Sequence, residues 1–339
     1  MTFDPSGVGQ KGSLFGFSYA LEDADLVILP VPWDVTTSYQ DGTAQAPEII
    51  LEESVQLDFS LKTISKPFEY PVAMCPISPE ILKRSNEARK IASEIILDLE
   101  EGNDPDAKSL GAVNGSSEWL NDHVKNLSTG WLEKDKVVGC LGGDHSGPLG
   151  LIQAIGERHS EFGILQIDAH MDLRKGYEGF IHSHASIMYN ALQIPSVSRL
   201  VQVGIRDYCE EELAFHSASN SRVITHFDED IQKKKWTGNT WPSQVDETIS
   251  DLPDQVYISF DLDGLDPSLC PNTGTPVPGG LSYYEAVYLI EALVKSGRKI
   301  IGFDISECGP QTWDANVASR LLYRLSSCVG VSRGRLGFA

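Results

Sequence analysis

A length of 339 residues allows one large α/β domain, because alternating strands and helices can extend a single sheet. The formal net charge is −21, with 27 Lys and Arg against 48 Asp and Glu. Such a charge repels phosphate backbones and anionic lipid heads, which argues against nucleic acid and membrane partners and favours cations. The hydrophobic content of 41% excludes disorder over most of the chain.

Cysteine usage and hydropathy favour a cytoplasmic location. The six cysteines are scattered without a CxxC pair, so we expect reduced thiols and no disulfide framework. No run approaches the ~20 apolar residues of a membrane-spanning helix, and the first residues lack the pattern of a signal peptide.

In chain order, residues 1–24 are interpreted as an N-terminal extension and residues 25–339 as a single domain. The first ~20 residues are rich in Gly and polar groups, and we expect them to wrap another surface or remain mobile. Residues 78–102 predict a helix with Ser78 as N-cap and Pro79 in its first position. The Gly, Asn, Asp and Ser content of residues 101–115 predicts a surface loop.

Short apolar runs, rich in Val and Ile, predict buried parallel strands. They lie at residues 26–31, 137–141, 163–167, 200–205, 256–260 and 299–305. Helical patterns occur between them, including helices that begin near residues 146, 282 and 313. This alternation predicts a three-layer α/β/α fold with a central, mainly parallel sheet, in which ligands gather beyond the carboxyl ends of the strands.

Three polar clusters stand directly after predicted strands. They are GGDHS at residues 142–146, DAHMD at 168–172 and SFDLDGLDP at 259–267. Asp168, His170 and Asp172 alternate, so in an extended segment their side chains point to the same side, and Asp261 and Asp263 repeat the pattern. One such cluster is often only a polar strand end, but three in one chain predict a site.

So many carboxylates would repel each other and resist ionisation unless cations compensated them. We therefore expect two divalent ions. Oxygen and imidazole ligands without thiolate suit Mn²⁺, with Ni²⁺, Co²⁺ or Fe²⁺ as alternatives, whereas structural zinc prefers Cys. Two ions ~3.5 to 4 Å apart can share a water and lower its pKa, so hydrolysis is the expected reaction class.

These motifs, together with TGTP at residues 273–276 and GGLS at 279–282, resemble in order and separation the signatures of the ureohydrolase family of arginases, agmatinases and formimidoylglutamases. The resemblance spans residues 25–328 and implies an arginase-like three-layer fold, a binuclear manganese site and assembly into trimers or hexamers. It also implies a ligand set in which Asp168, Asp172 and Asp261 are bridging or shared: His145, Asp168, His170, Asp172, Asp261 and Asp263. Asp144 and Asp266 would support the ligands or form turns.

The resemblance further implies residues for the reaction itself. Glu307, in GFDISE, matches the family glutamate that holds the guanidinium group by a charge-assisted bond. His184, in HSHAS, matches a mobile histidine that passes a proton to the leaving amine, with His182 as the alternative. Asp172 would orient the nucleophile by a hydrogen bond.

The residues expected to contact the substrate allow more than one interpretation of its identity. Arg174 stands where arginases carry an asparagine for the substrate carboxylate, and DLR here resembles formimidoylglutamases. If Arg174 faces the pocket, it favours a substrate carboxylate over an ammonium; if it pairs with an acidic neighbour such as Glu178, the pocket stays neutral. Cys209 replaces an acidic residue that arginases use, which disfavours a true arginase. Residues 30–42 resemble the N-terminal loop of agmatinases, where Trp33 is either a pocket wall or core.

The resemblance thus implies a binuclear-metal hydrolase that cleaves a C–N bond of a small cationic guanidino or amidino substrate and releases urea and an amine. Agmatine or another guanidino amine comes first, and a guanidino acid, free guanidine and formiminoglutamate are the alternatives. Zinc amidohydrolases of a related fold use a different ligand order. A non-catalytic metal-binding protein of the same fold is a separate class, which predicts metal binding without urea release.

Overall fold

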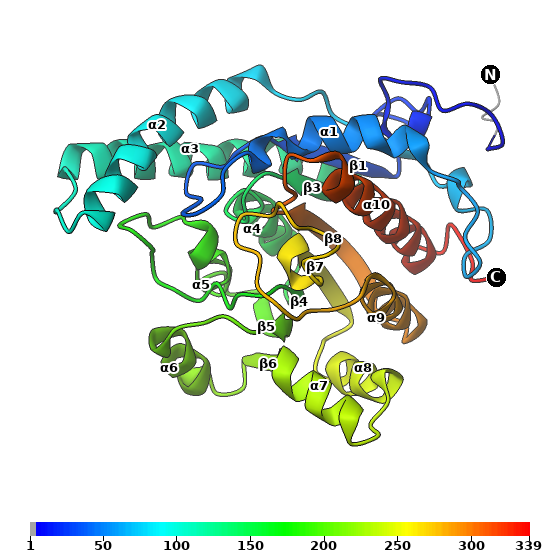
Figure 1. Cartoon of the computed structure of the whole chain (residues 1–339). Helices are drawn as coiled ribbons and strands as arrows, with labels where there is room; N and C mark the ends of the chain where they lie inside the picture. Colours follow the sequence, from blue (N-terminus) through cyan, green and yellow to red (C-terminus); the bar gives the residue numbers. More distant parts are fainter. Residues whose placement is uncertain (1–4) are drawn as a thin grey trace.

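The computed structural model describes residues 5–339, and its centre is an eight-stranded sheet in the order β2-β1-β3-β8-β7-β4-β5-β6 (Figure 1). Every pair of neighbouring strands is parallel. The strands are β1 (Leu26–Val31), β2 (Val72–Met74), β3 (Val137–Gly142), β4 (Phe162–Ile167), β5 (Val197–Ile205), β6 (Val223–Phe227), β7 (Gln255–Asp261) and β8 (Lys299–Ser306). All their carboxyl ends therefore meet at one edge of the sheet.

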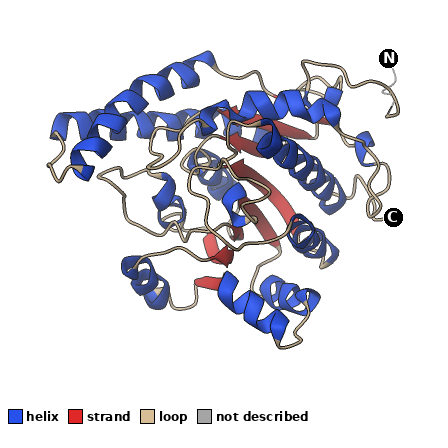
Figure 2. Cartoon of the chain, viewed as in Figure 1, coloured by secondary structure: helices blue, strands red, loops and turns tan. Residues whose placement is uncertain are grey.

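Helices cover both faces of this sheet (Figure 2). One face carries α1 (Ala46–Glu53), α7 (Asp228–Trp236), α8 (Trp241–Ser250), α9 (Tyr283–Lys295) and α10 (Thr312–Ser332). The other carries α2 (Pro79–Glu100), α3 (Ala107–Leu132), α4 (Leu149–Arg158), α5 (Ile187–Ala191) and α6 (Glu210–Ala218). A large apolar cluster fills each interface, so the predicted three-layer α/β/α fold is confirmed.

The predicted strands are all present, and the two strands without a prediction lie at the edges of the sheet. β2 has only three residues, and β6 is half-exposed and interrupted by polar Thr225 and His226. Edge strands need no continuous apolar run, because one side of their backbone faces away from the sheet.

The loop predicted for residues 101–115 is wrong in its second half. Helix α3 begins at Ala107, and the side chain of Asp106 caps it by accepting the backbone N–H of Ser109 at 2.8 Å. Gly111 and Gly115 lie on the exposed side of this helix. Packing of buried Val113 and Leu120 outweighs the weak helix propensity of those glycines.

The N-terminal segment is expected from the sequence to wrap another surface or to remain mobile. Residues 14–17 pack on another surface of this same chain, so the second alternative is wrong for them. Leu14, Phe15 and Phe17 are buried in the apolar cluster of this same chain. The Phe15 ring contacts the Tyr323 ring of α10 edge to face, with 5.1 Å between centroids. Residues 1–4 lie outside the described residues.

Within residues 5–339, no helix combines the length and the apolar character that a bilayer span requires.

Candidate active site

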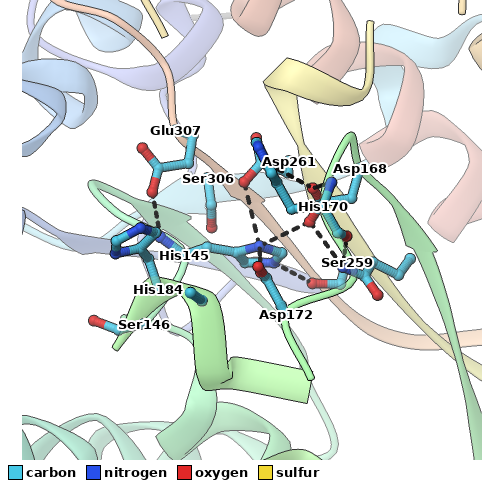
Figure 3. A network of polar contacts seen from close by, with 12 residues as sticks. His145, Ser146, Asp168, His170, Asp172, His184, Ser259, Asp261, Ser306 and Glu307 are labelled. Carbon is cyan, nitrogen blue, oxygen red and sulfur yellow. Dashed lines mark hydrogen bonds and ion pairs between the residues drawn. The ribbon is translucent and has the colours of Figure 1, made fainter. Parts of the chain in front are cut away.

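The predicted metal ligands lie at the carboxyl ends of β3, β7 and β4, and Glu307 lies at the end of β8 between them (Figure 3). His145 follows β3, Asp168 follows β4, and Asp261 is the last residue of β7. The four strands are neighbours in the sheet, so segments far apart in the sequence meet at one place.

One nitrogen of His145 faces three carboxylates. Its Nδ1 lies 3.1 Å from Asp168 Oδ2, 3.0 Å from Asp172 Oδ2 and 3.2 Å from Asp261 Oδ2 (Figure 3). These side chains are almost fully buried. The structure therefore brings four of the six predicted ligands together around one atom.

The opposite side of the His145 ring is fixed by Ser259 and Asp304. The Ser259 hydroxyl lies 2.8 Å from His145 Nε2 and donates to Asp304 Oδ2, also at 2.8 Å. Since the hydroxyl proton is used there, its oxygen accepts the Nε2–H of His145. This arrangement leaves the Nδ1 lone pair free for a cation.

His170 forms a second group. Its Nδ1 lies 2.9 Å from Asp263 Oδ2 and 3.7 Å from Asp168 Oδ1. Asp168 thus belongs to two sets of ligand atoms close enough to hold an ion, one with His145 and Asp172 and one with His170 and Asp263. A carboxylate shared by both sets can bridge two ions.

The chemistry of both groups fits divalent cations. Within the described part of the chain, His145 Nδ1 is buried and has no hydrogen-bond partner, although three carboxylate oxygens lie around it. Adjacent ligands of an octahedral ion with bonds of about 2.1 Å are about 3 Å apart, which matches the separations measured from this nitrogen. Imidazole nitrogen and carboxylate oxygen without thiolate favour ions such as Mn²⁺.

Burial and mutual repulsion act against ionised carboxylates here. Burial, and then the charge of Asp168, raise the pKa of Asp172 to about 7. Burial and the charges of Asp263 and Asp168 raise the pKa of Asp261 well above its ordinary value. Burial also acts to raise the pKa of Asp168, but the histidines that contact it hold that pKa below its usual range. Added positive charge would stabilise such a cluster.

Two non-glycine residues of the site adopt a left-handed backbone, Asp172 with φ 56° and Glu307 with φ 60°. This conformation is unfavourable for a residue with a Cβ and persists where surrounding contacts enforce it. Glu307 directly follows β8, whereas Asp172 lies five residues after the end of β4. Both side chains lie in the site, next to His145 (Figure 3).

Glu307 has one occupied and one free carboxylate oxygen. Oε1 accepts the backbone N–H of His145 at 2.9 Å, whereas Oε2 is buried and has no hydrogen-bond partner among residues 5–339. Burial, and then the charge of Asp144, raise the pKa of Glu307 well above its ordinary value. A guanidinium N–H would satisfy Oε2 and restore its charge.

His184 and His182 are placed differently. His184 lines a cavity of about 180 Å³ together with His170 and Asp172, whereas His182 is not among the residues that line it. Burial, followed by the charges of His170 and His145, lowers the pKa of His184 to about 3. The structure therefore places His184, and not His182, in the cavity beside the predicted ligands.

Arg174 also lines this cavity, but its charge is already paired. Its Nε lies 3.8 Å from Glu212 Oε2, and its guanidinium stacks 4.7 Å from the centre of the Tyr177 ring. Glu212 is held in turn by the backbone N–H groups of Leu173 at 3.0 Å and Cys209 at 2.9 Å. The acidic partner of Arg174 is thus Glu212 and not Glu178.

Trp33 is fully buried in the apolar cluster and is not among the residues that line the cavity. Its backbone carbonyl supports the GGDHS motif instead, because it accepts the N–H of Asp144 at 2.6 Å. A Cβ on Gly143 would lie 1.9 Å from the same carbonyl oxygen, so only glycine fits there.

Sequence reasoning missed Thr36 and Tyr177 as site residues. Thr36 Oγ1 contacts His184, which is 148 positions away in the chain, and the Tyr177 ring packs edge to face on the His184 ring. The sequence carries no signal for either contact. Asp144 and Asp266 form turns as expected, each accepting the N–H of the residue two positions later, Ser146 and Ser268.

The protein has a parallel sheet flanked by helices and two carboxylate–imidazole groups at the carboxyl edge of this sheet. It therefore belongs to the class of α/β proteins with a carboxylate-rich centre suited to metal ions. A family model described as the Arginase family matches residues 24–329. With that match covering most of its length, the chain belongs to the arginase family.

Known relatives agree with this membership. The N(1)-aminopropylagmatine ureohydrolase of Thermus thermophilus is 32% identical over 319 residues, 93% of this chain and 94% of that protein. The agmatinase of Pyrococcus horikoshii is 30% identical over 294 residues, 85% of this chain and 84% of that protein. The crystal structure of proclavaminate amidino hydrolase from Streptomyces clavuligerus matches with a TM-score of 0.72, covering 96% of this chain and 99% of that one. At 20% identity, this last match shows the fold alone.

Proposed function

We propose that the chain is a binuclear-metal hydrolase that cleaves a guanidino C–N bond of agmatine or an N-substituted agmatine and releases urea and an amine. Membership of the arginase family, the two ligand groups and the free oxygen of Glu307 support this reaction. Relatives at about the same identity are named for agmatine and for aminopropylagmatine, which supports this class of substrate.

The ligands would be His145, Asp168, His170, Asp172, Asp261 and Asp263, and the ions Mn²⁺ first, with Ni²⁺, Co²⁺ or Fe²⁺ as alternatives. Two such ions would lower the pKa of a shared water and so supply a nucleophile at neutral pH. Asp172 would orient that water by a hydrogen bond. Glu307 Oε2 would accept a guanidinium N–H and hold the carbon in place. His184 would pass a proton to the leaving amine.

The charge balance of the cavity supports a substrate with a positively charged tail. Arg174 is compensated by Glu212, and exposed Asp207 adds a further carboxylate to the lining. Away from the metal ligands, the cavity therefore presents two acidic groups against one cation. Opposite charges a few ångströms apart in a partly desolvated cleft attract by about 1 to 4 kcal/mol, so a terminal ammonium is favoured over a carboxylate.

A urea-release screen of the Mn²⁺-loaded protein tests this function. Agmatine and 4-guanidinobutyrate are a matched pair, since they present the same guanidino group on similar short chains with opposite terminal charges. We expect kcat/KM for agmatine to exceed that for guanidinobutyrate at least about tenfold, or about 1.4 kcal/mol. Arginine, guanidine, formiminoglutamate and aminopropylagmatine complete the panel.

A preference for guanidinobutyrate or formiminoglutamate would contradict the agmatine-type proposal and indicate that Arg174 reads the substrate. Metal binding without turnover of any compound would indicate the non-catalytic alternative. Asp207→Asn should lower the ratio of agmatine to guanidinobutyrate turnover, because it removes one carboxylate from the cavity lining.

Assembly into a homo-oligomer, a trimer or a hexamer, also stays a proposal, as do the N-terminal extension of residues 1–24 and the cytoplasmic location. Light scattering on the purified chain measures the oligomeric state directly.

A further inference from the structure

The buried hydroxyl of Thr36 lies between Asp144 and His184. Thr36 and Asp144 are fully buried. Thr36 Oγ1 lies 3.2 Å from Asp144 Oδ2, 3.3 Å from His184 Nδ1 and 3.1 Å from the backbone nitrogen of His184. One hydroxyl therefore links the motif after β3 to the histidine that lines the cavity.

Asp144 accepts hydrogen bonds on both oxygens. Oδ1 faces the backbone N–H of Ser146 at 3.0 Å and its hydroxyl at 2.5 Å. Oδ2 faces the backbone N–H of Thr36 at 3.2 Å and the Thr36 hydroxyl. Backbone N–H groups only donate, so each oxygen of Asp144 acts as an acceptor. The Thr36 hydroxyl consequently donates its single proton to Asp144.

The remaining contacts of Thr36 Oγ1 must then be made by its lone pairs. A hydroxyl has one donor and two acceptor sites. One lone pair accepts the backbone N–H of His184, and the other faces His184 Nδ1. Nδ1 must therefore carry a hydrogen, which in a neutral imidazole leaves the lone pair on Nε2.

We propose that Thr36 is a positioning residue that holds His184 as the tautomer with hydrogen on Nδ1, with Asp144 fixing the direction of the Thr36 hydroxyl. His184 Nε2 is then the atom that takes up a proton and delivers it to the leaving amine. The catalytic consequence rests on the proposed function, whereas the tautomer itself does not. The arrangement follows the logic by which a carboxylate orients a catalytic histidine in hydrolytic triads, here through an intervening hydroxyl.

Ser183 is the competing partner. Its hydroxyl also lies 3.3 Å from His184 Nδ1, and it accepts the backbone N–H of Ala185 at 3.3 Å. Among the residues that the structure describes, none offers the Ser183 proton a fixed acceptor of the kind that Asp144 provides to Thr36. Ser183 can therefore donate or accept, and it does not by itself define the tautomer.

The first experiment compares three variants of the Mn²⁺-loaded protein with agmatine. Thr36→Val keeps the shape of the side chain and removes the hydroxyl, and Thr36→Ser keeps the hydroxyl. Thr37→Val is the matched control, because its buried hydroxyl donates to the backbone carbonyl of Asp34 and not to His184. We expect Thr36→Val to lower kcat about 10- to 100-fold with KM within about threefold, whereas Thr36→Ser and Thr37→Val keep most of the turnover.

Two further variants separate positioning from a general structural effect. In a His184→Ala background, Thr36→Val should lower kcat no further, because the hydroxyl acts only through His184. An additive loss, or equal losses in Thr36→Val and Thr37→Val, would overturn the proposal. A loss carried by Ser183→Ala and not by Thr36→Val would also overturn it and assign the role to Ser183.

A spectroscopic measurement tests the tautomer without turnover. The protein is labelled with ¹⁵N-histidine and loaded with diamagnetic Zn²⁺, and the His184 signals are assigned by their loss in His184→Gln. The ¹⁵N shifts should report a protonated Nδ1 and a bare Nε2 in the wild type, and a mixture of tautomers in Thr36→Val. A protonated Nε2 in the wild type would refute the positioning role. Failure to hydrolyse any guanidino compound, with the expected shifts, would refute only the proposed function.

Discussion

Gly274 lies close enough to Glu307 that a side chain at position 274 would press on its carboxylate. A Cβ at position 274 would lie 2.9 Å from Glu307 Oε2, the oxygen proposed to hold the guanidinium group. In Gly274→Ala either this loop or the carboxylate must move, and a small displacement of a positioning group is costly. We expect kcat/KM for agmatine to fall at least about tenfold. Gly337→Ala, where a Cβ meets nothing within 4 Å, is the control and should keep full activity. An unchanged kcat/KM would show that Oε2 does not contact the substrate.

Glu178 gives the stability a pH dependence of its own. Burial, and then the charge of Glu100, raise the pKa of Glu178 to about 7, against the weaker opposing effects of Arg89 and Arg174. The native state therefore binds this proton more tightly than the unfolded chain does. The resulting stabilisation is complete below the ordinary glutamate pKa of 4.5 and is lost as the pH rises through about 7.

Glu178→Gln should remove this dependence. Relative to the variant, the wild type should become less stable between pH 5 and pH 8, as measured by urea unfolding at each pH. A difference between the two proteins that stays constant over this range would contradict the raised pKa of Glu178.

Close packing of whole helices depends on similar glycines. A Cβ on Gly150 of α4 would lie 2.3 Å from the backbone oxygen of Asn121 and 2.7 Å from the backbone nitrogen of Lys125, both in α3. Gly150→Ala must push the two helices apart, and we expect the free energy of unfolding to fall by about 1 to 3 kcal/mol. Gly115→Ala, on the open side of α3, should instead raise it by about 0.5 to 1 kcal/mol. Urea unfolding measures the free energy of unfolding of both variants. A change of the same sign in Gly150→Ala and Gly115→Ala would contradict this packing.

Metal binding concerns the molecule as a whole, since ligands from three strands must come together in the native state. We expect elemental analysis of the Mn²⁺-loaded protein to give two ions per chain and Asp263→Ala to give one, because Asp263 belongs to only one of the two groups. Ions that bind only the native state should also raise the free energy of unfolding, by about 2.7 kcal/mol per site when the free metal concentration is 100 times Kd. The midpoint temperature of thermal unfolding should rise accordingly. A fixed stoichiometry of one, unchanged in Asp263→Ala, would contradict the binuclear site.

The sequence by itself determined the six central strands of the sheet and the polar clusters that directly follow three of them. Both are local properties, since a continuous apolar run defines a buried strand and alternate polar residues after it share one side. The edge strands and the start of α3 were not determined in this way, because their stability comes from packing against neighbours and not from their own residues.

Only the tertiary structure decided which residues surround these clusters. Arg174 pairs with Glu212, which is 38 positions away in the chain. The carbonyl of buried Trp33 accepts a hydrogen bond from Asp144, 111 positions away. Thr36 contacts His184, 148 positions away. The direction of a side chain depends on what packs around it, and a single sequence does not encode those neighbours locally. The sequence therefore determines the polar clusters, the resemblance to the family implies which of their residues are ligands, and the packed fold decides the charge of the cavity and the histidine that lines it.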